Sequence, residues 1–214
     1  MKRRFFQQGL FLALSAVVAG GGWLVPAQAA DLPPDVFIKT MADEVMNTIK
    51  TDKLLQKGDM GKLMALVDTK VIPNVNFQRM TASAVGPAWR QATPAQKTRL
   101  QEEFKTLLVR TYASAVSTVS DMVVTVKPLR ASPDDNEVLV RSEVKGHGDP
   151  VQLDYRLEKT PGQGYGWRIY NLNVMGIWLV DNYRSQFAQT INAKGIDGLI
   201  EALAERNKAN AKQD

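Results

Sequence analysis

Hydrophobic and polar residues recur with two different periods along the chain, a helical period in the first half and a strand period in the second. Between residues 33 and 115, apolar side chains return at intervals of three and four, as on one face of an amphipathic helix. Thr93 followed by Pro94 supplies an N-cap and a proline at the first helical position. The spacing predicts helices over 37–49, 58–72, 76–84 and 94–115.

The next part of the chain alternates with a period of two, which is typical of half-buried strands. The predicted strands are 122–129, 138–145, 151–158 and 167–174, separated by short turns rich in glycine, proline and polar residues. Such short connections imply antiparallel neighbours, because parallel strands need long crossovers. Helical spacing returns near Ile177, ends at Gly195 and resumes from Ile196. The pattern therefore predicts an α+β domain with a four-stranded antiparallel sheet.

The first 29 residues have the pattern of a secretory signal peptide. A basic start, Lys2-Arg3-Arg4, precedes an apolar run over 10–24, and Ala27-Gln28-Ala29 provides a small-residue cleavage pattern. An N-terminal membrane anchor is the alternative, but the apolar run is short for a spanning helix. We therefore expect cleavage after Ala29 and one periplasmic domain over 30–214.

Charge gives no indication of a nucleic-acid partner. The formal net charge is +5, but Lys2, Arg3 and Arg4 contribute three of the positive charges and leave with the signal peptide. The remaining chain is close to neutral, whereas a nucleic-acid interface needs a clustered basic surface. We expect no nucleic acid among the partners.

The composition restricts the available chemistry. The 214 residues are 44% hydrophobic and 23% charged, with no cysteine and a single histidine, His147. Thiolate sites and multi-histidine metal sites are therefore excluded. No Gly-x-Ser-x-Gly nucleophile motif is present, and the glycines at 162, 164 and 166 precede a strand, so they indicate a turn and not a phosphate loop. We expect a protein that is not an enzyme and needs no metal or cofactor.

Large apolar side chains gather near the last predicted strand and the following helix. Within about twenty residues the chain contains Trp167, Ile169, Ile177, Trp178, Leu179, Tyr183 and Phe187. A filled core and the wall of a ligand cavity have the same composition, so the pattern leaves both interpretations open.

Four blocks of the sequence are distinctive: WRIYNLNVMGIWLVDNYRSQF over 167–187, VIPNVNF over 71–77, GPAWRQATPAQ over 86–96 and FKTLLVRTYA over 104–113. These blocks resemble the MlaC family of periplasmic phospholipid-binding proteins, also known as toluene-tolerance proteins. The blocks follow in the family's order, and the resemblance as a whole extends over nearly all of the chain after residue 29. Asn171 stands where the family usually has aspartate, Trp178 where it has a small polar residue, and Asn74 and Asn76 where histidine and aspartate are frequent.

The resemblance implies a monomeric carrier that moves phospholipid between two membrane complexes. These are MlaA with a porin at the outer membrane and the MlaD-containing ABC transporter of the inner membrane. Helices would wrap a twisted antiparallel sheet, with an apolar cavity between sheet and helices that encloses the acyl tails. Phospholipid is then cargo and no cofactor is implied.

The lipid pocket that we predict consists of apolar and aromatic residues from the long helix, the strands and the following helix. They are Phe104, Leu108, Tyr112, Val140, Leu153, Tyr155, Trp167, Ile169, Val174, Trp178, Leu179, Tyr183 and Phe187. The alternative is a periplasmic binding or adaptor module that has the same fold, a filled core and no lipid.

Overall fold

The computed structural model describes residues 31–118, 122–129, 131–132, 134–146 and 148–211. The predicted signal peptide and His147 lie outside the described residues. Within those described ranges, no helix is long and apolar enough to cross a membrane.

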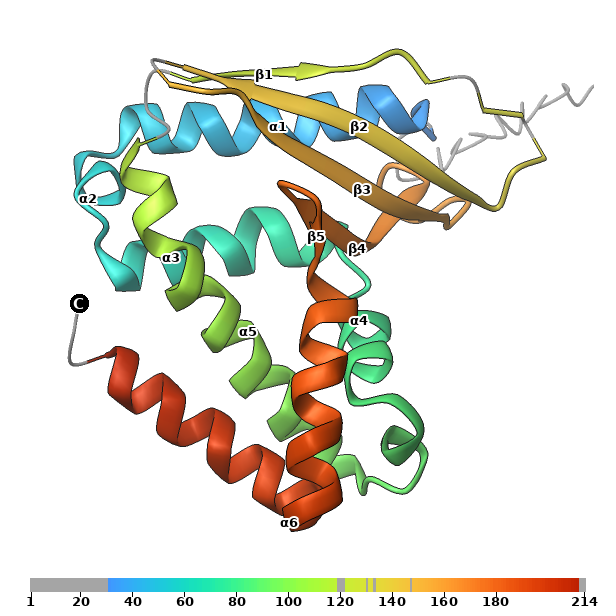
Figure 1. Cartoon of the computed structure of the whole chain (residues 1–214). Coiled ribbons are helices and arrows are strands. Elements are labelled where there is room, and N and C mark those ends of the chain that lie inside the picture. Colours follow the sequence, from blue (N-terminus) through green and yellow to red (C-terminus); the bar gives the residue numbers. More distant parts are fainter. Residues whose placement is uncertain (1–30, 119–121, 130, 133, 147, 212–214) are drawn as a thin grey trace, which may run out of the picture.

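The molecule consists of a sheet layer, with one helix along a face of the sheet, and a helical layer (Figure 1). The sheet layer contains α1 (Pro34–Thr51), β1 (Val123–Val126), β2 (Glu137–Lys145), β3 (Val151–Lys159), β4 (Trp167–Val174) and β5 (Ile177–Trp178). The remaining segments are α2 (Lys53–Gln56), α3 (Met60–Leu66), the π-helical turn η1 (Val67–Val71), the 3-10 turns η2 (Ile72–Asn74) and η3 (Gly86–Arg90), α4 (Phe77–Val85), α5 (Pro94–Thr118) and α6 (Leu179–Asn210).

Within the described residues, five strands form one sheet in the order β1-β2-β3-β4-β5, and each pair of neighbours is antiparallel. The predicted α+β class is confirmed, but the predicted number of four strands is wrong. Val174 pairs with Ile177 across a two-residue turn in which Met175 and Gly176 both have positive φ, 51° and 89°. The resulting β5 has only two residues, which is too short to show an alternating pattern, so its sequence resembles the start of the next helix.

A β-bulge in β4 changes which side chains face the helices. Arg156 pairs with Asn171 and Leu157 pairs with Ile169, so Tyr170 has no partner on β3. An extra residue of this kind shifts the strand's alternation by one position. Ile169 and Leu172 consequently face the same side although three positions separate them.

Two helices of the helical layer begin at residues whose capping role the sequence indicates. Thr93 and Gln96 form a capping box at α5, with the Gln96 amide 3.2 Å from the Thr93 hydroxyl and the Thr93 amide 2.9 Å from the Gln96 side-chain oxygen. Asn76 caps α4 by accepting a hydrogen bond of 2.9 Å from the Arg79 amide. These two starts agree with the predicted helices.

One predicted helix has a different form in the structure, and the predicted break at Gly195 is confirmed. The helix predicted over 58–72 is regular only in α3 and continues as a π turn and a 3-10 turn before the chain leaves at Asn74. Pro73 cannot donate a backbone hydrogen bond, which explains why the regular helix does not extend through it. In α6, Gly195 has φ 70° and ψ −170°, and the helix turns back there as two arms, coloured orange and red in Figure 1.

Buried apolar side chains form separate clusters in the two layers. The sheet cluster joins α1 to the sheet and contains Phe37, Ile38, Met41, Val140, Tyr155, Leu157, Trp167 and Ile169. The helical cluster joins α4, α5 and α6 and contains Ala84, Val85, Leu100, Phe104, Leu107, Tyr183, Phe187, Leu199 and Leu203. A smaller cluster at the end of α1 contains Ile49, Leu55, Leu63 and Leu66.

Candidate functional site

An apolar cavity of about 340 Å³ lies between the two layers. Volumes of this size are typical of pockets that enclose small molecules. Its lining residues are Met41, Val45, Ile49, Leu63, Leu66, Val67, Val71, Ile72, Val75, Phe77, Met80, Lys105, Leu108, Val109, Tyr112, Ala113, Tyr155, Ile169, Leu172, Val174 and Leu179. The wall draws on all three clusters, so the cavity occupies the space where they would otherwise meet.

Helix α5 contributes a continuous stripe to the wall. Lys105, Leu108, Val109, Tyr112 and Ala113 follow the spacing of one helical face. This stripe begins one residue after Phe104, which belongs to the helical cluster. The same helix therefore packs into a filled core along its first half and borders the cavity along its second half.

The sheet contributes Tyr155 from β3 and Ile169, Leu172 and Val174 from β4. The bulge at Tyr170 brings these three β4 side chains to the cavity side. The Ser142 hydroxyl oxygen lies 3.5 Å from the Tyr155 hydroxyl and 3.2 Å from the Leu153 carbonyl. Burial raises the pKa of Tyr155 above its ordinary value, because ionisation would place a charge in apolar surroundings.

Another part of the wall comes from α1, α3 and the π turn. Met41, Val45 and Ile49 lie four residues apart on α1 and face the cavity together. The π turn adds Val67 and Val71. Two ion pairs connect its polar side to neighbouring helices: Lys105 to Asp68 at 2.6 Å and Lys70 to Glu44 at 3.5 Å.

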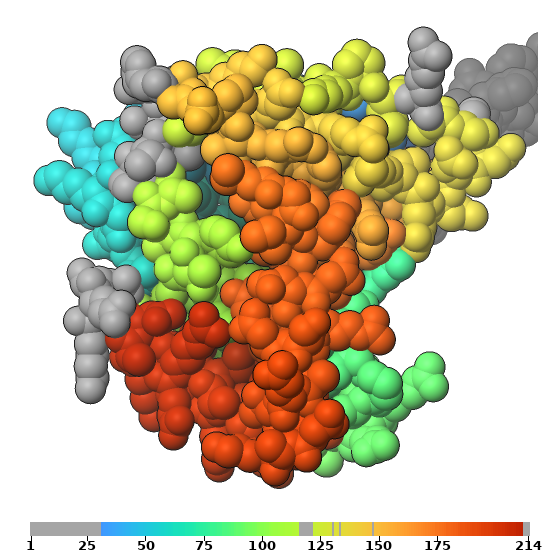
Figure 2. Space-filling view, in the orientation of Figure 1, coloured from blue at the N-terminus to red at the C-terminus, as the bar shows by residue number. Residues whose placement is uncertain are grey.

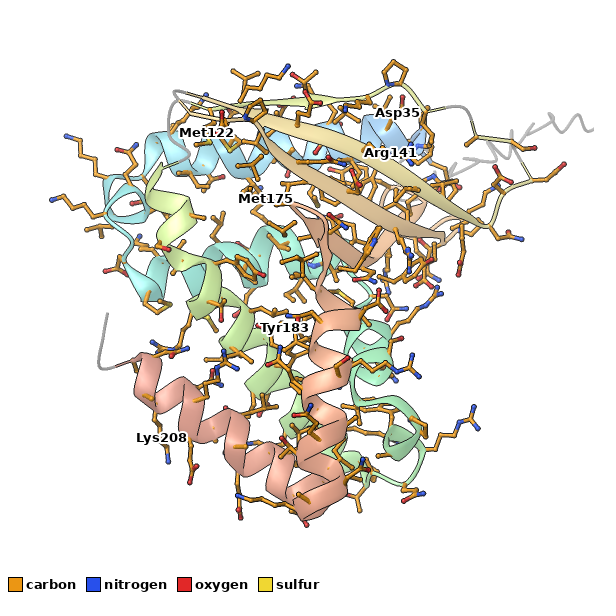
Figure 3. The ribbon with its side chains drawn as sticks, in the orientation of Figure 1. Asp35, Met122, Arg141, Met175, Tyr183 and Lys208 are labelled. Atoms are coloured by element: carbon orange, nitrogen blue, oxygen red, sulfur yellow. The ribbon has the colours of Figure 1, made fainter. Side chains whose placement is uncertain are left out.

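Exposed apolar side chains lie close to the cavity. Figure 2 shows a recess between α5 and the β4–β5 hairpin, with atoms of earlier helices visible inside it. Tyr112 on α5 is 36% exposed, and Met175 at the hairpin turn, labelled in Figure 3, is 66% exposed. Burial, followed by the influence of Tyr183, raises the pKa of Tyr112, so its hydroxyl stays neutral in the physiological range.

The structure places six of the thirteen predicted pocket residues on the cavity wall: Leu108, Tyr112, Tyr155, Ile169, Val174 and Leu179. Their contact with lipid remains a prediction.

Three other predicted residues, Phe104, Tyr183 and Phe187, lie in the helical cluster and not on the cavity wall. The ring of Phe104 meets those of Tyr183 and Phe187 edge to face, with centroids 5.0 and 5.2 Å apart. Figure 3 shows Tyr183 on the arm of α6 that runs beside α5. Such tilted contacts fill the space between helices, which is why these rings have no free surface for a ligand.

Val140, Leu153 and Trp167 also lie outside the cavity wall. Val140 and Trp167 belong to the sheet cluster, and Leu153 packs against it. The indole nitrogen of Trp167 donates a hydrogen bond of 3.0 Å to the Leu32 carbonyl, which holds the segment just before α1 on the sheet. These three residues share the sheet face of Tyr155 and Ile169 but do not line the cavity.

Trp178, the remaining predicted residue, packs against an arginine and does not line the cavity. The guanidinium carbon of Arg156 lies 4.2 Å from its ring centroid. Asn171, the other departure from the family pattern near this point, accepts hydrogen bonds from the Leu172 and Val180 amides at 2.9 and 3.2 Å. Asn171 thereby satisfies an amide in the first turn of α6, and an amide oxygen serves there as an acceptor just as a carboxylate would.

The prediction missed the part of the cavity wall whose residues precede α5 in the sequence. The α1 stripe was visible as a four-residue spacing, but nothing in the spacing indicated that it borders a cavity. Val71, Ile72, Val75 and Phe77 belong to the block at 71–77 that carries the family resemblance, and all four line the cavity. That block was therefore the available signal. Among the described residues, no group of three or more histidine, cysteine, aspartate or glutamate side chains is arranged to hold a metal ion.

Comparison with known proteins connects this architecture to lipid binding. The chain is 44% identical to the phospholipid-binding protein from Ralstonia solanacearum, whose structure was solved in complex with a phospholipid. The match has a TM-score of 0.80 and covers 84% of this chain and 99% of the Ralstonia chain.

Two relatives resemble the chain at lower identity. The toluene tolerance protein ttg2D from Pseudomonas putida is 29% identical, over 85% of this chain and 86% of its own length. The intermembrane phospholipid transport system binding protein MlaC from Haemophilus influenzae is 21% identical, over 82% and 83%. A family model described as MlaC protein matches residues 39–205. With its sheet, its helices and most of its length accounted for by that model, the chain belongs to the MlaC family.

Proposed function

We propose that this chain is a periplasmic phospholipid carrier that holds acyl tails in the cavity between the sheet and the helices. The six predicted residues on the wall, together with the α1 stripe and the π turn, contact the hydrocarbon. The headgroup stays at the protein surface. Phospholipid is cargo, and the protein carries out no chemical conversion.

The single observation that carries this proposal is the apolar character of the cavity wall. Transfer of hydrocarbon from water to such surroundings is favourable by about 0.8 kcal/mol per methylene. A lipid tail therefore gains several kcal/mol on entering the cavity, whereas a polar metabolite would lose its hydrogen bonds to water. The phospholipid in the Ralstonia structure, a protein of the same fold and 44% identity, supports the same assignment.

We further propose that the carrier moves lipid between the complex of MlaA with a porin at the outer membrane and the MlaD-containing transporter of the inner membrane. The name of the Haemophilus relative, a binding protein of an intermembrane transport system, supports this route. The pattern of the first 29 residues supports export, with cleavage after Ala29.

The alternative, an adaptor module of the same fold with no lipid, requires a filled interior. A cavity of about 340 Å³ bordered by three apolar clusters favours the carrier instead. Interiors of proteins that hold no ligand are packed with few voids larger than a water molecule.

Lipid analysis of the protein purified from the periplasm tests the proposal. We expect phospholipid in organic extracts at a constant molar ratio to protein, and transfer of labelled lipid between two vesicle populations in the presence of the protein. Protein that is free of lipid after repeated gentle preparation, and that takes up none from vesicles, would support the adaptor.

A further inference from the structure

One charged side chain interrupts the apolar wall. Of the described residues that line the cavity, Lys105 is the only one with a charged side chain. It lies on α5, one turn before Leu108 and Val109. Its ammonium nitrogen is 2.6 Å from the Asp68 carboxylate on the π turn, so an ion pair spans the seam between α5 and η1.

The Lys105 side chain crosses from the cavity to the surface. It lines the apolar wall, yet it retains 25% exposure, and its partner Asp68 retains 48%. Long cationic side chains place their methylene stems against apolar surface and keep the charged end in water. A phospholipid changes from hydrocarbon to charge in the same order. A tail that lies against Leu108 and Val109 with its glycerol end toward Lys105 would bring its phosphate to the level of the ammonium.

We infer that Lys105 and Asp68 form a headgroup site for a zwitterionic phospholipid of the phosphatidylethanolamine class. The phosphodiester binds at Lys105 and the headgroup ammonium binds at Asp68. This inference rests on the proposed function. The ion pair has one charge of each sign, and the headgroup has the same two charges close together. When the lipid binds, its phosphate replaces Asp68 as the partner of Lys105, and its ammonium replaces Lys105 as the partner of Asp68.

Asp68 provides the discrimination. A phosphatidylglycerol headgroup has a phosphate but no ammonium, so it would take Lys105 and leave the carboxylate with no opposite charge. Selection against such a ligand by an unpaired charge is a general way to obtain specificity. The other ion pair of the π turn, Lys70 with Glu44, connects it to α1 and contains one charge of each sign. It therefore adds no net charge that would favour an anionic lipid.

The expected preference is modest, because the charges are partly exposed. Ion pairs near water change an equilibrium by up to about fivefold, while the tails supply most of the affinity. We expect the protein to take up phosphatidylethanolamine about threefold more than phosphatidylglycerol of the same tails.

The test offers the protein vesicles that contain equal amounts of dioleoyl-phosphatidylethanolamine and dioleoyl-phosphatidylglycerol, followed by separation and mass spectrometry of the bound lipid. Asp68→Asn should bring the ratio of the two lipids to one or below, because nothing then disfavours the anionic headgroup. Lys105→Met should raise the ratio above that of the parent, because the isolated carboxylate repels phosphatidylglycerol and still attracts the ammonium.

The two variants should change the lipid ratio in opposite directions, and this distinguishes headgroup binding from a purely structural role of the ion pair. If the ion pair only connects α5 to η1, both variants lower the melting temperature by similar amounts and leave the lipid ratio unchanged, and that result overturns the inference. Lys39→Met and Asp43→Asn remove a matched exposed pair, 2.5 Å apart on α1, and should leave the ratio unchanged.

Further measurements distinguish lipid from free phosphate and this inference from the proposed function. Inorganic phosphate or phosphoethanolamine at millimolar concentration should not bind the lipid-free protein, and saturable binding of either at Lys105 would overturn the headgroup assignment. Equal uptake of both lipids by the parent protein overturns the headgroup site alone. Absence of any uptake overturns the carrier itself.

Discussion

Leu107 and Leu108 are neighbours on α5 but face regions of opposite character. Leu107 is fully buried in the helical cluster, where it packs with Leu100 and Phe104. Leu108 borders the same cluster on one side and the cavity on the other. A leucine in the same helix thus packs inside a filled core at position 107 and lines the cavity at position 108. Composition and helical spacing do not differ between the two positions, so only the arrangement of the other elements separates them.

The largest expected effect comes from truncating these two leucines separately. Leu107→Ala should lower the free energy of unfolding by about 3–5 kcal/mol, because it opens a hole in a filled cluster. Leu108→Ala should cost only about 1–2 kcal/mol, because it enlarges an existing space. Urea unfolding of both lipid-free variants measures the difference. Equal losses would show that the two regions are packed alike and would remove the basis of the comparison.

Filling the cavity should affect lipid uptake more than stability. Ala113 lies on the wall, where an indole ring would take the volume that hydrocarbon requires. Ala113→Trp should lower the ratio of bound lipid to protein by about fivefold, while the lipid-free protein stays as stable as the parent or becomes more stable. Ala95→Trp, on the exposed side of the same helix, is the matched control and should leave uptake unchanged. Full uptake by Ala113→Trp would place the lipid elsewhere.

The burial of Tyr155 at the cavity wall should make the stability of the protein depend on pH in the alkaline range. Burial raises the pKa of Tyr155, so the folded state holds this proton more tightly than the unfolded state, in which the pKa is about 10. The associated stability is complete below pH 10 and is lost as the pH rises above it, with a slope of up to about 1.4 kcal/mol per pH unit.

Tyr155→Phe should remove that part of the alkaline loss at a cost of about 1 kcal/mol or less at neutral pH, where it removes the weak contact with Ser142. Unfolding midpoints between pH 7 and 11 measure this difference. Tyr112, Tyr165 and Tyr170 also have raised pKa values and remain in the variant, so the difference from the parent belongs to Tyr155. Identical pH profiles for the two proteins would contradict its burial.

The smallest effect is expected at Trp178, which lies in neither region. Its ring packs against Arg156, and contacts of this kind contribute about 0.5–1 kcal/mol when partly exposed. Trp178→Ser should lower stability by that amount and leave lipid uptake unchanged. A change in the number of lipids bound would instead return Trp178 to the cavity mouth, where the sequence had placed it.

The sequence predicted the elements of this fold better than it predicted the cavity. Thr93 with Pro94, Asn76 and Gly195 marked true helix boundaries, because capping and positive φ depend on local residue chemistry. The bulge at Tyr170 could not be read in the same way, since it depends on the register between β3 and β4. Strand β5 was missed because two residues carry no period.

Five of the six predicted residues on the cavity wall lie in the family blocks 104–113 and 167–187, whereas the residues of block 71–77 and of the α1 stripe were missed. The α1 stripe of Met41, Val45 and Ile49 is an ordinary buried face in sequence terms, and it borders the cavity because α1 contacts both the sheet and η1. Phe104, Tyr183 and Phe187 have the composition expected of a lipid pocket, but they pack against one another. Whether large apolar side chains meet or leave a space depends on tertiary geometry that a single sequence does not contain.

The cavity has a consequence for how long the protein survives in the cell, because a ligand bound there stabilises the native state. A ligand that binds only the native state adds to its stability by mass action, by about 2.7 kcal/mol when its free concentration is a hundred times its Kd. The carrier that has just delivered its lipid is therefore the form that opens most often and the form that proteases reach first. We expect its abundance to follow the supply of lipid, so that degradation removes idle carriers without a dedicated regulator.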